Sequence, residues 1–275
     1  PAASGARRLR GLWIARELPF PLDTGDRIYS ARLMKSVADA GAALTVTGFP
    51  APEGVTPPAD WPITWRTVAG PRSSKLRALL STMPLVAGTH ATSAYRQLVA
   101  TLAREPWDFV VIDQYGMGWA LPYFDRLPPA QRPVRVHIAH DHEASVYASL
   151  VREFRGSPLK RAVLWQNGLK TAAFERGIAR RVDLLTVITD EDGERFALDA
   201  PQTPRVVLTP GYSGAVGLPR QITDDVPRHV VMVGSYHWVA KQENLRRFVR
   251  AADARFAQAG ITLHVIGAMP PALAD

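Results

Sequence analysis

Short apolar runs rich in β-branched residues alternate along this chain with longer stretches in which apolar residues recur every three or four positions. The short runs are continuously apolar, which is typical of parallel strands buried on both faces. Strands that alternate with helices predict a parallel sheet covered by helices on both sides. The predicted strands are LRGLWIA, ALTVTGF, PITWRTV, WDFVVID, PVRVHIA, DLLTVIT, RVVLTP, HVVMVG and ITLHVIG.

Several predicted helices carry recognisable ends. Gly41 follows a helical pattern over residues 26–40 and can adopt the left-handed conformation that closes a helix. Ser157 and Pro158 are suited to the N-cap and first turn of another helix, and Gly260 ends the last one. The apolar positions expected to face the core are Ile28, Ala31, Met34, Val37 and Ala38 in the first helix, Leu159, Val163, Leu169, Phe174 and Ile178 in the second, and Leu245, Phe248, Val249, Ala252 and Phe256 in the third.

The segment GYSGAVGLPRQITDDVPR lacks periodicity and holds three glycines and two prolines, which is typical of an interdomain linker. We therefore predict a flexible leader at 1–8, a complete doubly wound Rossmann-like domain at 9–210, the linker at 211–228, and the start of a second Rossmann-like domain at 229–275. The second domain has about half the length that such domains usually need, so we expect it to be cut short.

Composition restricts the function classes. The 275 residues include no cysteine, which excludes disulfides, cysteine-ligated zinc and thiol catalysis, and fits a cytoplasmic protein. The net charge of +8 favours anionic partners such as nucleotides, phosphorylated lipids or the inner membrane leaflet, where peripheral contact is an expectation from charge alone. The basic residues are scattered and form no run interleaved with aromatic residues, so we expect no nucleic-acid partner.

Glycine-containing loops follow two of the predicted strands. No GxxxxGK[ST] motif occurs, which excludes that phosphate-binding loop. Gly116 and Gly118 follow WDFVVID as a partial GxGxxG, which favours a tight turn packed on the sheet over a dinucleotide site. In the loop ELPFPLDTGDRIYSARLM, Gly25 stands at a helix start capped by Asp23 or Thr24, where free amides suit an anion; the alternative is an ordinary capped helix.

The segment HIAHDHEAS places histidines and carboxylates at the carboxyl end of a predicted strand, where ligands bind in open α/β sheets. A metal site is one interpretation, but strand alternation separates His137 from its neighbours, and only His140 and His142 have workable spacing. We therefore predict no metal, and favour hydrogen bonding of His140, Asp141 and Glu143 to sugar or phosphate.

A second strand, loop and helix follow the linker, in VVMVGSYHWVAKQENLRRFV. Gly234 and Ser235 come directly after the strand, and Lys241 begins the helix. Backbone amides, a hydroxyl and an ammonium would then converge on one point, which suits a diphosphate. The alternative is an ordinary surface lysine.

Together these motifs resemble the family 4 glycosyltransferases, retaining enzymes with two Rossmann-like domains in the GT-B fold. The resemblance runs over nearly the whole chain. It rests on PFPLDTG before the first helix, HDHE, DLLTVITDEDGERF, LTPGYSG, VVMVGSYHW and LHVIGAMP, in that order and spacing. The chain departs from the family in carrying Ser235 where many relatives have arginine, and in lacking an asparagine between Pro210 and Gly211. The acidic motif that grips the donor would lie beyond Asp275.

The resemblance implies transfer of a hexosyl-type sugar from a nucleotide-diphosphate sugar to a glycan or lipid-linked acceptor, as in polysaccharide biosynthesis, with retained configuration and no cofactor. Lys241 and the helix amides would stabilise the leaving diphosphate, and His140 would bind the donor sugar. The resemblance places Gly25, Gly234 and Ser235 on the donor side. The acceptor side would hold Arg27, Tyr115, Asp141 and Glu143.

Two other function classes remain open at this stage. One is a non-catalytic protein on the same scaffold that binds a glycan or an anionic lipid. The other is a metal-dependent hydrolase that uses HDHE. Because of its length, we expect the chain as it stands to be too short for activity.

Overall fold

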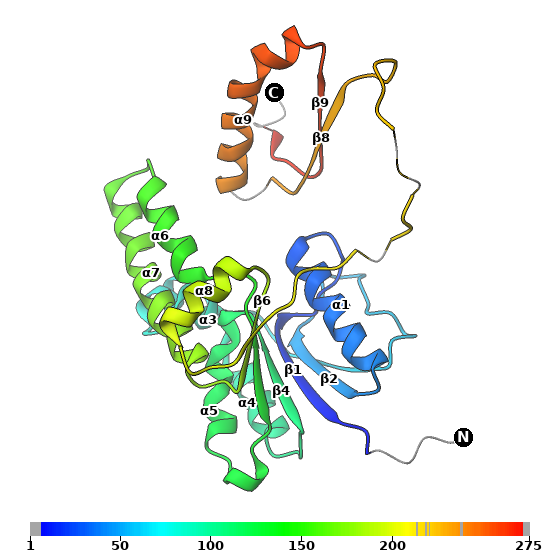
Figure 1. The fold of residues 1–275 in the computed structure, drawn as a ribbon. Helices are drawn as coiled ribbons and strands as arrows, with labels where there is room; N and C mark the ends of the chain where they lie inside the picture. The colour runs from blue at the N-terminus through cyan, green and yellow to red at the C-terminus, as the bar shows by residue number, and fades with distance from the viewer. Residues whose placement is uncertain (1–6, 213, 218, 220, 237–238, 272–275) are drawn as a thin grey trace, which may run out of the picture. The chain divides into compact units, whose positions relative to one another are not determined.

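The computed structural model describes residues 7–212, 214–217, 219, 221–236 and 239–271. The chain divides into two compact units, Pro1–Gly211 and Tyr212–Asp275, and the division falls inside the segment predicted as a linker (Figure 1). Each unit is described below by itself.

The first unit is built on a parallel sheet of seven strands in the order β3-β2-β1-β4-β5-β6-β7. The prediction of a doubly wound parallel sheet is confirmed, because every predicted strand of this unit pairs in parallel with its neighbours. The strands are β1 (Arg10–Glu17), β2 (Ala43–Phe49), β3 (Ile63–Thr67), β4 (Phe109–Asp113), β5 (Val134–Ile138), β6 (Leu184–Val187) and β7 (Arg205–Val207).

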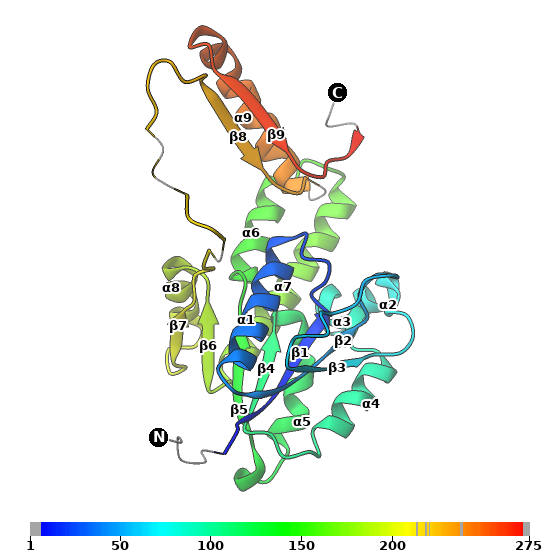
Figure 2. The same cartoon turned by 90° about the vertical axis from the view of Figure 1, so that its right-hand side faces the viewer.

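Helices cover both faces of this sheet (Figures 1 and 2). Helix α1 packs on one face, whereas α4, η1, α5 and the end of α7 pack on the other. The helices are α1 (Gly25–Asp39), α2 (Lys75–Leu80), α3 (Leu85–His90), α4 (Ser93–Leu102), η1 (Tyr115–Ala120), α5 (Leu121–Asp125), η2 (Pro129–Gln131), α6 (Glu143–Glu153), α7 (Pro158–Ala179) and α8 (Asp190–Asp199).

Three hydrophobic clusters form the core of the first unit among the described residues, and strand alternation separates the two main ones, a larger and a smaller cluster. On β1, Leu12 and Ile14 enter the larger cluster, whereas Trp13 and Ala15 enter the smaller one beneath α1. Successive side chains of a strand point to opposite faces, so a continuously apolar strand fills both clusters. This is why β1 and β4 read as unbroken apolar runs at the centre of the sheet.

The two glycines after β4 stand where the chain packs closely against neighbouring side chains. A Cβ on Gly116 would lie 2.5 Å from Val86 Cγ1, and one on Gly118 would lie 2.2 Å from Ile178 Cδ1. Either contact is too short for carbon atoms, so only glycine fits unless the neighbours move. The structure therefore favours the tight, closely packed turn over a dinucleotide loop.

Helix α7 begins where the sequence predicts, but its first half faces the solvent. Ser157 is the N-cap, accepting a hydrogen bond from the Lys160 amide at 3.3 Å, and Pro158 is the first helical residue. The expectation that Leu159, Val163 and Leu169 face the core is wrong, because their exposed fractions are 76%, 39% and 53%. Helix α7 extends beyond the ends of the strands, where its first half pairs with α6. Only its last turns pack onto the core (Figure 1).

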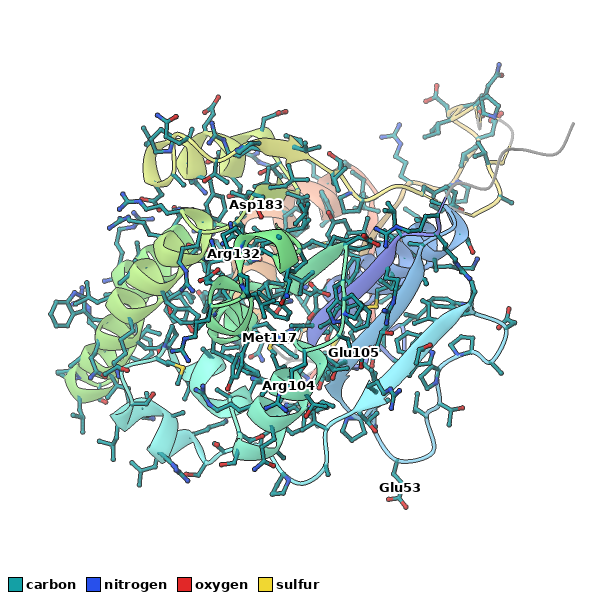
Figure 3. The ribbon with its side chains drawn as sticks, turned by 90° about the horizontal axis from the view of Figure 1, so that it is seen from below. Glu53, Arg104, Glu105, Met117, Arg132 and Asp183 are labelled. Atoms are coloured by element: carbon teal, nitrogen blue, oxygen red, sulfur yellow. The ribbon has the colours of Figure 1, made fainter. Side chains whose placement is uncertain are left out.

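The loops before β4, β5 and β6 lie at the amino-terminal ends of the strands. Figure 3 looks onto this end of the sheet, with Glu105, Arg132 and Asp183 in those loops. Ion pairs connect the loops to the strands, such as Arg135 to Asp183 at 2.8 Å. This end of the sheet serves the fold by fixing where strands start.

The second unit consists of β8 (His229–Val233), α9 (Val239–Gln258) and β9 (Thr262–Ile266), with β8 and β9 parallel. One face of the strands lies against α9, and the other exposes Val231, Val233 and Ile266 by 53%, 77% and 53%. Leu245 of α9 is buried as expected, and Gly260 ends the helix with a φ of +64°.

Candidate active site

The candidate site lies where the strand order of the first unit reverses. From β1 the chain first adds β2 and β3 on one side, and then β4 to β7 on the other. Crevices at the carboxyl ends of the two strands that flank such a reversal are where open α/β sheets bind ligands. A pocket lies at this point, between the ends of β1 and β4 and the start of α1. It is lined by Ala15, Arg16, Glu17, Pro19, Asp26, Arg27, Ser30, Asp113 and Gln114.

A buried histidine and aspartate form the polar centre of this site. His140 follows β5 and its Nε2 lies 2.9 Å from Oδ1 of Asp113, the last residue of β4. The indole of Trp13 donates a hydrogen bond to the other carboxylate oxygen of Asp113 at 2.9 Å. Burial alone would raise the pKa of Asp113, but the hydrogen bonds from His140, Trp13 and Ser30 lower it below its usual range. Asp113 is therefore a buried carboxylate that orients His140.

Two further residues fix the position of His140. The ring of Tyr29 meets the imidazole edge-on at 5.3 Å between centroids, and the Tyr29 hydroxyl donates to the Leu208 carbonyl at 2.8 Å. On the other side, Gln114 Nε2 lies 3.4 Å from His140 Nδ1. Gln114 has a φ of +65°, the only positive φ outside glycine among the described residues. Such strained conformations cluster at ligand sites, which agrees with the place of Gln114 on the pocket wall.

The loop between β1 and α1 contributes charged groups to the pocket rim. Arg27 pairs with Glu17 at 2.7 Å and with Asp23 at 2.9 Å, and Arg16 pairs with Asp26 at 2.8 Å. Burial favours the neutral form of Glu17, but Arg27 and Arg72 lower the pKa of Glu17 below its usual range. Arg27 thus lines the pocket as a guanidinium held by carboxylates.

Gly25 is the first residue of α1 and faces open space. A Cβ placed there would have no atom within 4 Å, so the space in front of the helix start is free. Thr24 is the N-cap residue, although its side chain makes no capping hydrogen bond. The donor role of Gly25 remains a prediction that this open space allows.

The residues predicted for the acceptor side lie in different environments. Asp141 is exposed, and Glu143 is the first residue of α6. Burial, followed by the charge of Asp141, raises the pKa of Glu143 to about 7. Tyr115 is only 4% exposed and belongs to the larger core cluster, which leaves little of its ring for an acceptor.

A carboxylate that the sequence analysis missed holds the start of α6 in place. Glu175 of α7 is fully buried and accepts hydrogen bonds from the Glu143 and Ala144 amides, both at 2.9 Å. These are amides that a helix start otherwise leaves without partners. Burial raises the pKa of Glu175 to about 8, although the two amides oppose this shift. Glu175 therefore fixes Glu143 beside the site.

The three neighbouring imidazoles form hydrogen bonds with different partners. His137 is fully buried with Nδ1 2.9 Å from the Ile112 carbonyl, and burial lowers its pKa to about 4. His142 Nδ1 lies 2.7 Å from Ser145 Oγ, away from His140. In the part of the chain that the structure describes, no group of three or more histidines and carboxylates could hold a metal ion.

In the second unit, Gly234, Ser235 and Lys241 lie near one end of β8. Gly234, Lys241 and Tyr236 line a pocket between β8 and α9. The Gly234 amide donates to the Ile266 carbonyl at 3.0 Å, so it completes the sheet and is not free for a diphosphate, contrary to the convergence of amides that the sequence suggests. Lys241 is exposed and has no ion pair with any described residue, so its ammonium is free to meet an anion.

The raised pKa of Glu143 predicts a measurable pH dependence of stability. A folded-state pKa of about 7 means that folding retains a proton that the unfolded glutamate loses at lower pH. This contribution to the free energy of unfolding is present below the unfolded pKa and is lost as pH rises through about 7. Glu143→Gln should therefore reduce the loss between pH 5 and 8 by about 1–2 kcal/mol in urea unfolding series.

Glu153 provides a matched control, because it is an exposed glutamate at the other end of α6. Glu153→Gln should leave the pH profile unchanged. Identical profiles for Glu143→Gln and the unmodified protein would contradict the assignment of a raised pKa to Glu143.

Solved structures share this fold at low sequence identity. Sucrose-phosphate synthase from Thermosynechococcus elongatus matches with a TM-score of 0.60 and 12% identity, over 95% of this chain and 71% of that one. UGT71G1 of Medicago truncatula, solved with UDP-glucose, matches with a TM-score of 0.54 and 13% identity, over 97% and 68%. WaaG, a glycosyltransferase involved in lipopolysaccharide biosynthesis, matches with a TM-score of 0.52 and 17% identity, over 96% and 71%.

These similarities define the class of fold. The parallel sheets with their covering helices match GT-B glycosyltransferase folds, so the predicted fold class is confirmed. No protein-family model and no curated protein sequence matches this chain. One fold can host many reactions, so the particular reaction depends on the residues of the site.

The described helices include no candidate for a membrane span. None of them is both long enough and apolar enough to cross a bilayer.

Proposed function

We propose that this protein is a glycosyltransferase that moves a sugar from a nucleotide-diphosphate sugar to a glycan or lipid-linked acceptor with retention of configuration. The observation that supports this best is the pocket at the strand-order reversal, where buried Asp113 orients His140. A buried, oriented imidazole beside an open helix start suits polar recognition of a sugar and its phosphate. The shared GT-B fold agrees with this activity.

Each unit would bind a different part of the substrates. In the first unit, His140 would contact the donor sugar and Gly25 would let the first loop approach it. Arg27, Asp141 and Glu143 would bind the acceptor, and a Glu143 pKa of about 7 suits hydrogen bonding in either protonation state. We keep Tyr115 on this side as the weakest assignment, because it is almost fully buried.

The second unit would hold the diphosphate through Ser235 and Lys241, with Gly234 shaping the turn. In the reaction the bond from the anomeric carbon to the phosphate oxygen would break, a bond to the acceptor oxygen would form, and the acceptor hydroxyl would pass its proton to the departing diphosphate oxygen. The electron pair stays on the diphosphate, whose growing charge the Lys241 ammonium would stabilise. The proposal needs no cofactor besides the nucleotide sugar, because Lys241 supplies the cationic charge.

The experiment is to incubate the product of the complete gene with a panel of nucleotide-diphosphate sugars and glycan or lipid-linked acceptors. Release of nucleoside diphosphate together with a glycosylated acceptor would support transfer. NMR of the anomeric proton in the product would then report the configuration. His140→Ala serves as the variant that should lose transfer while keeping the fold.

The outcomes separate the parts of the proposal. A product of inverted configuration would overturn retention and leave glycosyl transfer standing. Absence of nucleoside diphosphate release with every donor, from protein whose circular dichroism shows it folded, would overturn the transferase.

A further inference from the structure

The outer surface of α2 and of the first half of α7 combines exposed apolar side chains with exposed cationic ones that have no ion pair with any described residue. We call it the α2–α7 surface, and define it by Leu76, Leu80, Leu159, Trp165 and Leu169 with Lys75, Arg77 and Arg161. Lys170 of α7 donates hydrogen bonds to the carbonyls of Leu79 and Ser81 at 2.7 Å and 2.6 Å, so the two helices touch. Figure 3 shows them side by side, α7 in light green and α2 in cyan.

The apolar side chains of this surface are unusually exposed for their size. The exposed fractions of Leu80, Leu159 and Trp165 are 83%, 76% and 55%, and those of Leu76 and Leu169 are 70% and 53%. Isolated exposed leucines are ordinary, but several large ones on two touching helices mark an interaction site. The core has no need of them, because Asn167, Thr171 and Ile178 form the inward face of α7.

The charge of the surrounding segments is of one sign only. Residues 61–104 contain no aspartate or glutamate, and neither do residues 154–174, whereas both contain arginines and lysines. Lys75, Arg77 and Arg161 are exposed and have no ion pair among the described residues. Exposed cations in a protein with mixed charges usually find a carboxylate nearby, so a surface free of acidic residues is complementary to an anionic partner.

The combination selects the kind of partner. A tryptophan and leucines that protrude among long cationic side chains allow the apolar groups to enter acyl chains while the ammonium and guanidinium groups remain at the headgroups. A folded acidic protein would need pockets that match each protruding side chain, whereas a fluid bilayer adapts to them. We propose that the α2–α7 surface docks the protein onto a membrane that contains anionic lipids.

Helix α7 connects this surface to the candidate site. Helix α6 begins at Glu143 beside the site, and α7 reaches the same point through Glu175. The docking surface and the border of the site therefore share helix α7. The proposal does not depend on the reaction, since lipid binding is measured without any sugar donor.

The test is sedimentation of the protein with vesicles of phosphatidylcholine alone and of phosphatidylcholine with phosphatidylglycerol. We expect binding to the anionic vesicles only, and weaker binding at high salt, because exposed charges are screened. Lys75→Glu with Arg77→Glu should lower the partition coefficient about tenfold or more. Trp165→Ala with Leu169→Gln should lower it by a similar factor.

Matched controls change exposed residues elsewhere. Arg132→Glu lies at the edge of the sheet where strands begin, and Leu198→Gln removes a leucine of α8 that is 86% exposed. Both should bind vesicles like the unmodified protein, and all variants should keep its thermal midpoint, since none of these side chains is buried.

Three results would overturn the proposal. The first is no binding to the anionic vesicles, which would leave an acidic protein as the alternative partner. The second is equal binding to both kinds of vesicle. The third is binding that the α2–α7 substitutions change no more than the controls do.

Discussion

Asp113→Asn should lower kcat/KM for glycosyl transfer by about 100-fold, because the carboxylate orients His140. His140 Nε2 lies 2.9 Å from Asp113 Oδ1, and both side chains are almost fully buried. An asparagine has nearly the same shape but presents a neutral amide, which can leave the imidazole in the other tautomer. Steady-state kinetics on the complete gene product would measure the loss, mainly in kcat.

Trp13→Phe is the matched control for this prediction. It removes the indole hydrogen bond to the other oxygen of Asp113, at 2.9 Å, and leaves the contact with His140. We expect a loss of stability of about 1–3 kcal/mol with a much smaller change in kcat. If Trp13→Phe lowered kcat as much as Asp113→Asn, the effect would belong to packing and not to the orientation of His140.

Lys241→Ala should lower kcat by about 100-fold or more, with a smaller effect on KM. Its ammonium is exposed at the first turn of α9 and has no ion pair among the residues described. A charge that acts on the departing diphosphate matters most in the transition state, where the negative charge is largest. Lys241→Arg should retain part of the activity, because it keeps the charge but changes its position.

Arg255→Ala tests whether charge alone explains such a loss. It removes one positive charge from the last turn of the same helix. The kinetic constants should remain within about twofold of the unmodified protein, because an exposed charge so far along the helix is screened by solvent. Full activity of Lys241→Ala would show that another group holds the diphosphate.

Much of the fold could be predicted because burial leaves a local pattern. Strands buried on both faces are continuously apolar, so β1 and β4 could be recognised from their residues alone. The start of α7 was equally clear, since Ser157 and Pro158 act within one helical turn. Its inward face was predicted correctly at Phe174 and Ile178 but wrongly at Leu159, Val163 and Leu169. Periodicity shows that one side of a helix is apolar, but not whether the protein covers that side.

The candidate site was predicted only in part, for the same reason. His140 could be found from its place after an apolar strand. Its partners could not, because Asp113 and Trp13 meet across the sheet from positions a hundred residues apart. An acidic residue that ends the apolar run WDFVVID was the available signal. Glu175 gave none, since a glutamate within a helix usually faces water.

The hydrogen bond from Tyr29 to the Leu208 carbonyl has a mechanical consequence. The Tyr29 hydroxyl of α1 and the Leu208 carbonyl lie 2.8 Å apart, so this bond holds the chain just after β7 against α1 before the chain leaves the first unit. The same tyrosine ring touches His140. One side chain therefore both anchors the chain that follows β7 and packs against the imidazole of His140, so loss of the Tyr29 ring would release both at once.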